Sequence, residues 1–173
     1  KENLTPYTNM EFAHFEHQLS GDWLAYSQNA IVIKNTDLRQ LPTQRPFFKN
    51  PSLPGEGYPF DYLQNSRLQI ATPIRVLRLS ADTSYVFAIS PLGYGWIDSR
   101  DIAYTDHAFE QFFITATLQT PSRDEDVLLD RDSLFVESLN VGTLLPFVGG
   151  ITYYPHRTRH AMAVWEPAKT NTV

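Results

Sequence analysis

Two histidine pairs have spacings that resemble those of metal sites. His14 and His17 stand three residues apart, and His156 and His160 stand four residues apart. Zinc peptidases use an HExxH helix, in which two histidines bind the metal and the glutamate acts as general base. Neither pair fits that pattern, and the second pair lies beside a proline. We therefore interpret these residues as surface or hydrogen-bonded histidines, and we predict no metal site and no cofactor.

Nucleophilic chemistry is equally unsupported by the sequence. The chain contains no cysteine, which excludes a cysteine nucleophile, a cysteine zinc site and a disulfide within it. It also lacks the GxSxG, P-loop and GxGxxG patterns. Residues 123–132, RDEDVLLDRD, carry five acidic residues in ten but not the spacing of an EF-hand loop. We interpret them as a solvated turn and predict no catalytic residue in this chain.

The segment PGEGYPFDYLQNS, residues 54–66, gathers side chains that can contact a ligand. It has two glycines, two prolines, three aromatic residues and two carboxylates. It lies in a connection of about 23 residues, and a loop that long inside a compact domain is usually functional. A structural interpretation stays open, in which Phe60 and Leu63 fold back onto the sheet and Asp61 caps a turn.

Composition limits the class of protein. The 173 residues are 42% hydrophobic and 13% aromatic, which is enough apolar material for a packed core. The net charge of −5 argues against nucleic-acid binding, because binding phosphates needs a basic face. No apolar run approaches the roughly 18 residues of a membrane helix. Twelve prolines favour many short elements and turns.

One helix and a series of short strands must position these residues. Thr8 and Glu11 have the spacing of a capping box, Phe12, Phe15 and Leu19 share one helical face, and Gly21 is a plausible stop. Strands are then predicted at 30–34, 73–80, 85–90 and 96–98. In the third of these, alternation places Val86 and Ala88 on the face opposite Tyr85, Phe87 and Ile89.

A second set of strands is predicted in the C-terminal half. The segments are 112–118, 127–130, 133–138, 144–148, 151–155 and 161–165, separated by polar or glycine-containing turns. We place a boundary near Asp106. Strands at this spacing favour small barrels or sandwiches, so we predict an all-β chain.

Several short motifs in the sequence resemble those of the bacterial SH3 domains that accompany NlpC/P60 cell-wall peptidases. The pieces LRQLPT (38–43), FDYLQNS (60–66), GWI (95–97) and DIA (101–103) carry the resemblance to the first such domain. VGTLLPFV (141–148), followed by a short strand and a proline, is similar to the second. The resemblance implies two SH3-like β-barrels, at 29–106 and 107–166. An N-terminal stabilising segment at 1–28 and a tail or linker at 167–173 complete the expected organisation.

The resemblance also implies a function. In this family the paired SH3-like domains precede a papain-like catalytic domain that cuts peptidoglycan stem peptides at the γ-D-glutamyl–diamino-acid bond. This chain has no cysteine and ends where that domain would begin, so we expect a non-catalytic fragment that targets peptidoglycan and shapes the substrate site. Its expected partners are the stem peptide and a downstream catalytic domain. The implied location is the bacterial envelope, periplasmic or secreted, with a lipid-anchored precursor as one route.

Candidate site residues follow from the same resemblance, since the family's long loop borders the catalytic cleft. We assign Glu56, Tyr58, Asp61, Tyr62 and Gln64 to the substrate side of that loop. Carboxylates accept hydrogen bonds from ammonium groups, and tyrosines offer a hydroxyl and a flat face. Tyr94 and Trp96 are candidate groove aromatics, although Trp96 also fits a place in the core. The alternative function is a peptide- or protein-binding SH3-like module with no role at the cell wall.

Overall fold

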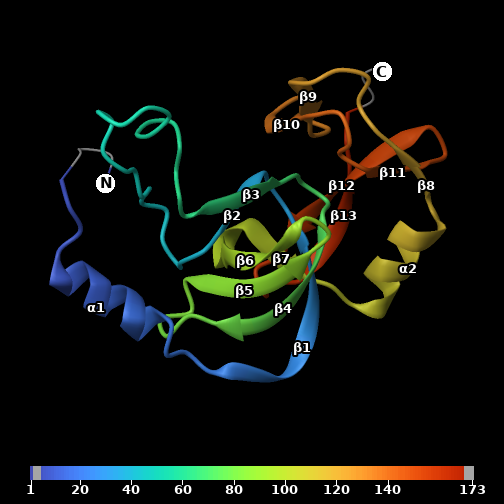
Figure 1. Cartoon of the computed structure of the whole chain (residues 1–173). Coiled ribbons are helices and arrows are strands. Elements are labelled where there is room, and N and C mark those ends of the chain that lie inside the picture. The colour runs from blue at the N-terminus through green and yellow to red at the C-terminus, as the bar shows by residue number, and fades with distance from the viewer. Residues whose placement is uncertain (2–4, 170–173) are drawn as a thin grey trace.

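Figure 1 shows the computed structural model, which describes residues 1 and 5–169 apart from the side chains of residues 24–26. Within these residues the protein is mostly β, with two short α-helices and one 3-10 turn. The helices are α1 (Asn9–Gln18) and α2 (His107–Thr115), and the turn is η1 (Ser99–Asp101). The strands are β1 (Trp23–Val32), β2 (Thr36–Arg39), β3 (Gln64–Leu68), β4 (Pro73–Leu79), β5 (Tyr85–Ser90), β6 (Gly93–Asp98), β7 (Ile102–Tyr104), β8 (Thr117–Gln119), β9 (Asp126–Leu129), β10 (Phe135–Leu139), β11 (Leu145–Val148), β12 (Ile151–Arg157) and β13 (Ala163–Pro167).

Helix α1 begins at the predicted capping box. The Glu11 N–H donates to the Thr8 hydroxyl at 3.3 Å, and the Thr8 N–H donates to the Glu11 carboxylate at 2.9 Å. The predicted apolar face is incomplete, because Phe15 is buried but Phe12 is 46% exposed. Gly21 lies beyond the end of the helix, where a Cβ would stand 2.3 Å from the Leu79 carbonyl oxygen. This glycine therefore allows the close approach of two backbones.

The N-terminal half is one seven-stranded sheet. Its order is β3-β2-β6-β5-β4-β1-β7, and every pairing in it is antiparallel. The predicted alternation in β5 is confirmed, since Val86 and Ala88 are fully buried while Ile89 is 49% exposed. Strands β3 and β7 stand at the two ends of the order, so the sheet is not closed into a barrel.

The start of the C-terminal half corrects the sequence prediction. Residues 112–118 were predicted as a strand, but helix α2 runs to Thr115 and only Thr117–Gln119 form a strand. Asp106 caps this helix, because its carboxylate accepts the Phe109 N–H at 2.8 Å. Phe109 and Phe113 lie one helical turn apart and both stack on the Trp165 ring, at centroid distances of 4.2 and 5.6 Å. Burial of this aromatic face outweighs the strand propensity of the segment.

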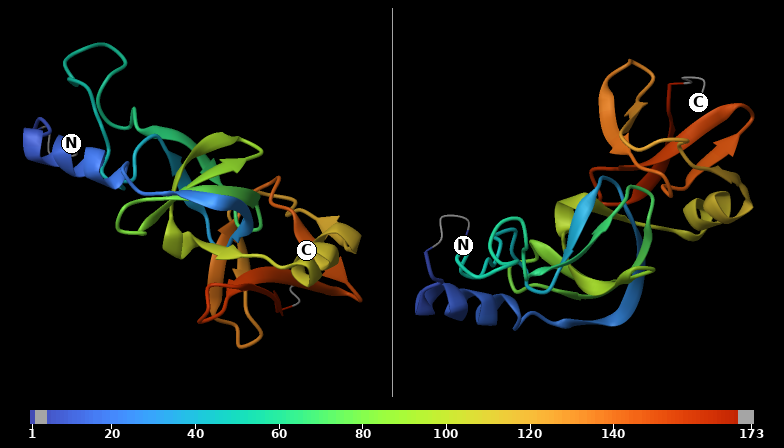
Figure 2. Two further views of the ribbon diagram at one scale, coloured as in Figure 1. Left: turned by 90° about the horizontal axis from the view of Figure 1, so that it is seen from below. Right: turned by 45° about the horizontal axis from the view of Figure 1, so that its top comes forward.

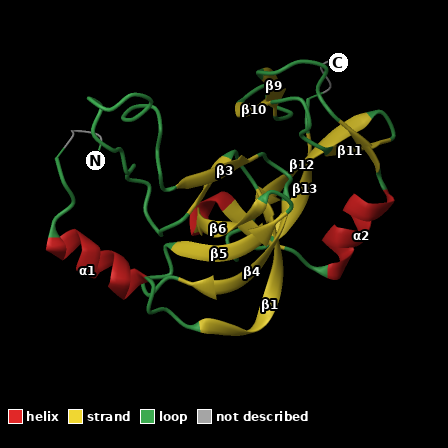
Figure 3. Ribbon diagram, in the orientation of Figure 1, coloured by secondary structure: helices red, strands yellow, loops and turns green. Residues whose placement is uncertain are grey.

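The remaining strands form two separate sheets. One has the order β13-β12-β11-β8, and the other is the hairpin of β9 and β10. Figure 3 shows the hairpin standing apart from the larger sheet. These strands also do not close into a barrel, so the all-β, SH3-like expectation holds while the expected closed barrels are not seen in the described residues.

The two halves share buried apolar residues and hydrogen bonds. The Asn35 N–H donates to Glu137 at 2.8 Å, and the Asn35 side-chain amide donates to the Ser138 carbonyl at 2.7 Å. One hydrophobic cluster contains residues of both halves: Ile31, Ile70, Ala71, Ala103, Phe109, Leu128, Leu139, Leu145, Tyr154, Ala163 and Ala168. The expected boundary near Asp106 falls between β7 and α2, at a point where the halves are packed together.

The expected tail at 167–173 begins inside the sheet. Pro167 is the last residue of β13, and Ala168 is buried. The Lys169 N–H donates to the Leu129 carbonyl at 2.9 Å. The chain is thus held by pairing up to Lys169, and residues 170–173 lie outside the described part.

Candidate functional site

The long loop between β2 and β3, residues 40–63, contains most of the assigned site residues. It is the cyan excursion in Figure 1, and Figure 2 shows it beside α1 at the end of the molecule away from the C-terminal half. The Tyr7 ring stacks on Phe47 with a centroid distance of 5.8 Å, and Arg45 pairs with Glu11 of α1 at 2.8 Å. The N-terminal segment therefore supports the base of the loop.

Asp61 holds the two ends of this loop together. One carboxylate oxygen accepts the N–H groups of Phe47 and Leu63 at 2.8 and 2.9 Å. The other accepts from the Arg39 guanidinium at 2.8 Å, and the Arg39 side chain is only 2% exposed. Burial raises the pKa of the Asp61 carboxyl, but these hydrogen bonds and the Arg39 charge outweigh burial and leave the pKa below its ordinary value. Asp61 thus shapes the loop.

Glu56 and Tyr62 are hydrogen-bonded to each other across the tip of the loop. The Tyr62 hydroxyl donates to both Glu56 carboxylate oxygens, at 2.8 and 2.7 Å. The Lys49 ammonium pairs with Glu56 at 3.2 Å and stands 3.9 Å from the centre of the Tyr62 ring. The hydrogen bond from Tyr62 and the Lys49 charge both lower the pKa of Glu56. These side chains form a charged cluster on the loop surface.

Tyr58 is the assigned residue most available to a ligand, with 83% of its surface exposed. Its ring makes an edge contact with Phe48 at 6.0 Å. Gln64 is also exposed and donates to Asp37 at 2.9 Å. Phe60, in the same loop, is 56% exposed. It borders an open hollow of about 620 Å³, which is lined by Gly55, Pro59, Phe60, Asp61, Tyr62 and Gln64.

The two assigned groove aromatics occupy different environments. Trp96 is 3% exposed and packs against Phe87 at 5.4 Å, so its indole belongs to the core beneath the surface. Tyr94 is 67% exposed and lies 6.1 Å from Phe87. Tyr94 borders a second hollow, of about 500 Å³, lined by Gln40, Asn65, Phe87, Leu92, Gly93, Tyr94 and Gly95. Gln40, Asn65 and Phe87 were not assigned from sequence, because no local pattern shows that they meet.

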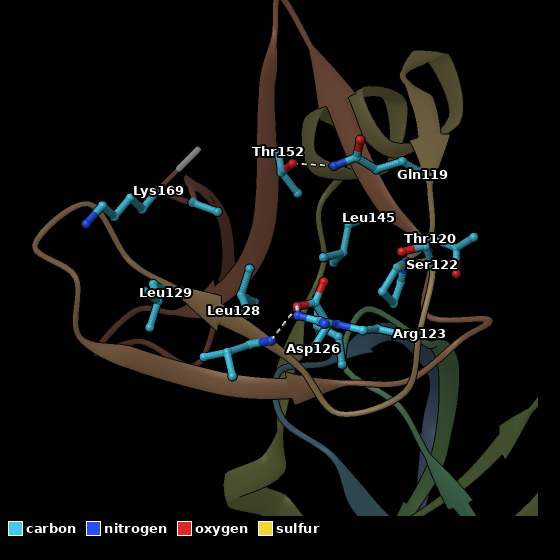
Figure 4. Close-up of a pocket in the computed structure, with 14 residues that line it drawn as sticks. Gln119, Thr120, Ser122, Arg123, Asp126, Leu128, Leu129, Leu145, Thr152 and Lys169 are labelled. Carbon is cyan, nitrogen blue, oxygen red and sulfur yellow. Dashed lines mark hydrogen bonds and ion pairs between the residues drawn. The ribbon is translucent and has the colours of Figure 1, made fainter. Parts of the chain in front are cut away.

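A third hollow lies in the C-terminal half and was also missed. Figure 4 shows this crevice, of about 510 Å³, between the four-stranded sheet and the β9–β10 hairpin. Its lining comes from six runs of residues: 119–123, 126–129, 139, 145, 152 and 168–169. Arg123 and Asp126, which sequence analysis placed in a solvated turn, stand on its wall. Only the tertiary arrangement reveals it.

The four histidines of the two pairs are all exposed. Within residues 1 and 5–169, no group of three or more histidine, aspartate or glutamate side chains is placed to hold a metal ion. In the same part of the chain, no helix combines the length and apolarity needed to span a membrane. The chain's cysteine-free sequence also excludes a cysteine nucleophile.

Comparison with known proteins supports the resemblance found in the sequence. Residues 46–98 match the family model of the SH3 domain of SH3b1 type. The fold is similar to a solved structure of a novel NlpC/P60 endopeptidase from Photobacterium damselae subsp. piscicida, with a TM-score of 0.90 and 27% sequence identity. The alignment covers 99% of this chain but 39% of that one. No curated protein matches the sequence. The predicted similarity to the SH3-like region of such an endopeptidase is thereby confirmed.

Proposed function

We propose that this chain is a non-catalytic, cell-wall-associated module of an NlpC/P60 peptidase. The observation that carries the proposal is the fold similarity, which extends over nearly the whole chain but over less than half of the endopeptidase. The chain supplies no cysteine, so a cysteine peptidase reaction would need a catalytic domain outside it. Peptidoglycan lies outside the cytoplasm, and an extracytoplasmic location follows from the proposal.

The loop at 40–63 is the part of the module that we assign to the substrate side. The buried pair of Arg39 and Asp61 fixes its ends, while Tyr58 and Phe60 are presented to solvent. A loop held in this way loses little conformational entropy when a ligand binds. Stem peptides carry free amines and carboxylates, and the Glu56 carboxylate and Tyr58 hydroxyl are suited to such groups. In this proposal Asp61 positions the loop, and Tyr58 makes the contact.

The alternative is a module that binds an extended peptide and ignores the cell wall. The hollow beside Tyr94 favours this second candidate, because Tyr94 and Leu92 are exposed by 67% and 61% and the Phe87 ring lies 6.1 Å from that of Tyr94. Aromatic grooves of this kind bind proline-rich peptides in other SH3 domains.

The two candidates differ in whether the chain binds purified insoluble peptidoglycan. We would compare co-sedimentation of the wild-type chain, the Tyr58→Ala/Tyr62→Ala variant and Tyr94→Ala. The proposal expects the wild type to sediment, the loop variant to sediment less than the wild type, and Tyr94→Ala to behave as wild type. Loss of binding by Tyr94→Ala alone would move the wall-binding surface from the loop to the hollow beside Tyr94. If the wild type does not bind, wall targeting by this chain is refuted.

The substrate-side assignment needs the full-length peptidase. There, Tyr58→Ala should raise the KM for a stem-peptide substrate with little change in kcat, because it removes a binding contact outside the catalytic domain. Tyr94→Ala is the matched aromatic control. Unchanged kinetics in Tyr58→Ala and Tyr62→Ala would remove the loop from the substrate site.

A further inference from the structure

The crevice of the C-terminal half has the form of a small-molecule site (Figure 4). Its volume of about 510 Å³ lies within the range typical of such sites. The floor is made of residues from the core: Leu128, Leu139, Leu145 and Ala168, each no more than 7% exposed. The crevice exists because the hairpin and the four-stranded sheet do not close on each other. Apolar surface is therefore accessible at the bottom of a polar opening.

Neutral hydrogen-bonding groups line the upper walls. Gln119 and Thr152 face each other from β8 and β12, and the Gln119 amide donates to the Thr152 hydroxyl. Thr120 and Ser122 follow on the chain leaving β8, and the Thr120 hydroxyl accepts the Gly142 N–H at 2.8 Å. These groups can orient a polar ligand but do not select its charge.

Two charged side chains, Arg123 and Asp126, stand near the opening of the crevice. The Arg123 guanidinium lies 3.7 Å from the Asp126 carboxylate, and the two side chains are 79% and 24% exposed. One Asp126 oxygen accepts the Val127 N–H at 3.1 Å, and the other receives no hydrogen bond from the described residues. Lys169 also lines the crevice, but its ammonium donates to Ser133 at 2.7 Å and points away from Arg123 and Asp126 in Figure 4.

We propose that this crevice binds the zwitterionic head group of an amino acid carried on a short methylene chain. The ligand carboxylate pairs with Arg123, whose planar guanidinium matches its geometry, and the ligand ammonium pairs with Asp126. The methylenes lie on the floor formed by Leu128 and Leu145. A ligand with only an anionic group would meet Asp126, and one with only a cationic group would meet Arg123. A zwitterion satisfies both charges.

The ligand class rests on the proposed function. A stem peptide built with diaminopimelate carries an amine and a carboxylate on the terminal carbon of that residue's side chain. A stem peptide built with lysine carries the amine alone. The crevice should therefore prefer a stem peptide built with diaminopimelate to one built with lysine, and the C-terminal half becomes a second contact with the polymer.

Binding of two synthetic tripeptides to the 173-residue chain tests this inference. The probes are L-Ala-γ-D-Glu-meso-diaminopimelate and L-Ala-γ-D-Glu-L-Lys, compared by isothermal titration calorimetry. We expect the first to bind about tenfold tighter, the effect typical of one charge-assisted hydrogen-bonding contact. Arg123→Ala should abolish the preference, and Asp126→Asn should weaken both probes. Arg131→Ala/Asp132→Asn removes the same two charge types from an exposed turn and should change neither affinity.

Three results would overturn the inference: equal affinity for the two tripeptides, no binding of either, or a preference that survives Arg123→Ala. Its failure is distinguishable from that of the proposed function, because the loop variants are assayed separately on insoluble peptidoglycan and in the full-length peptidase. Tripeptides bound equally, together with an effect of Tyr58→Ala, would reject the crevice and retain the loop. A preference for the diaminopimelate tripeptide, without any effect of Tyr58→Ala, would retain the crevice and reject the loop.

Discussion

Replacing Asp61 with alanine should destabilise the protein much more than replacing an ordinary surface aspartate. The substitution removes the acceptors of two backbone N–H groups and leaves the Arg39 guanidinium, 2% exposed, without its counter-charge. Breaking a buried ion pair from one side costs about 3–5 kcal/mol, because the remaining charge stays out of water. Arg39 retains its hydrogen bond to the Arg45 carbonyl at 2.9 Å, which favours the lower end, about 3 kcal/mol.

Urea denaturation followed by circular dichroism measures this loss. With a slope of about 1–3 kcal/mol/M, a loss of about 3 kcal/mol lowers the urea midpoint by at least about 1 M. Asp132→Ala, in an exposed turn, should change the free energy of unfolding by no more than about 0.5 kcal/mol. A cost below about 1 kcal/mol for Asp61→Ala would show that the pair does not hold the loop.

The pair of Arg39 and Asp61 also makes the free energy of unfolding depend on pH. The pKa of Asp61 is lower in the folded chain than its ordinary value of 3.8, so the unfolded chain binds a proton first. The contribution of Asp61 is therefore complete above pH 3.8 and is lost as the pH falls through the folded pKa. The difference in unfolding free energy between wild type and Asp61→Ala should shrink over that range. A difference that is constant with pH would contradict the assignment.

Three further predictions concern the supports of the loop and the core. Gly57→Ala should destabilise the loop by about 1–3 kcal/mol, since Gly57 has φ of +86° and a Cβ would stand 2.8 Å from the Cβ of Pro51. Hydrogen exchange should become faster in residues 40–63 alone, and unchanged exchange there would contradict the prediction. Thr8→Ala should cost about 1 kcal/mol through loss of the hydroxyl that caps the helix. NMR titration should find the pKa of Glu11, now about 2, still well below 4.5, because its main cause is the hydrogen bond from the Thr8 backbone N–H, which the substitution keeps; a Glu11 pKa that returns to 4.5 would refute this. Spectrophotometric titration should find Tyr154 ionising near pH 12, because burial and then the Glu166 charge raise its pKa. The pKa of Tyr154 should return to its ordinary value of 10.0 on unfolding. A pKa of 10.0 in the folded chain would show that Tyr154 is not buried.

Local patterns predicted some elements of the N-terminal half but not strands β2, β3 and β7. The capping box of Thr8 and Glu11 is a short-range device and can be read from four residues. The alternation of β5 is equally local, because one face of the strand is buried. Asp61 fits a turn cap by its sequence, but its direct contact with Arg39 depends on how a loop closes. Sequence spacing cannot show such a contact.

Tertiary packing decided the places where the prediction differed. Phe112 and Phe113 fit an alternating strand pattern, yet α2 forms because its aromatic residues reach Trp165, more than fifty residues later in the chain. The crevice depends on the gap between two sheets, and no single segment carries a signal for it. Residues far apart in sequence determine each of these outcomes.

The loop and the C-terminal half lie at opposite ends of one connected body (Figure 2), and the crevice belongs to that half. This arrangement bears on how the module would engage a polymer. The shared apolar cluster and the bonds from Asn35 link the two halves without a flexible linker. Two contacts on a body of this kind have a fixed spacing. Binding at one end then raises the effective concentration of ligand at the other only for polymer segments that match the spacing. Single stem peptides cannot satisfy both ends, so the module should bind intact peptidoglycan with higher avidity than either tripeptide.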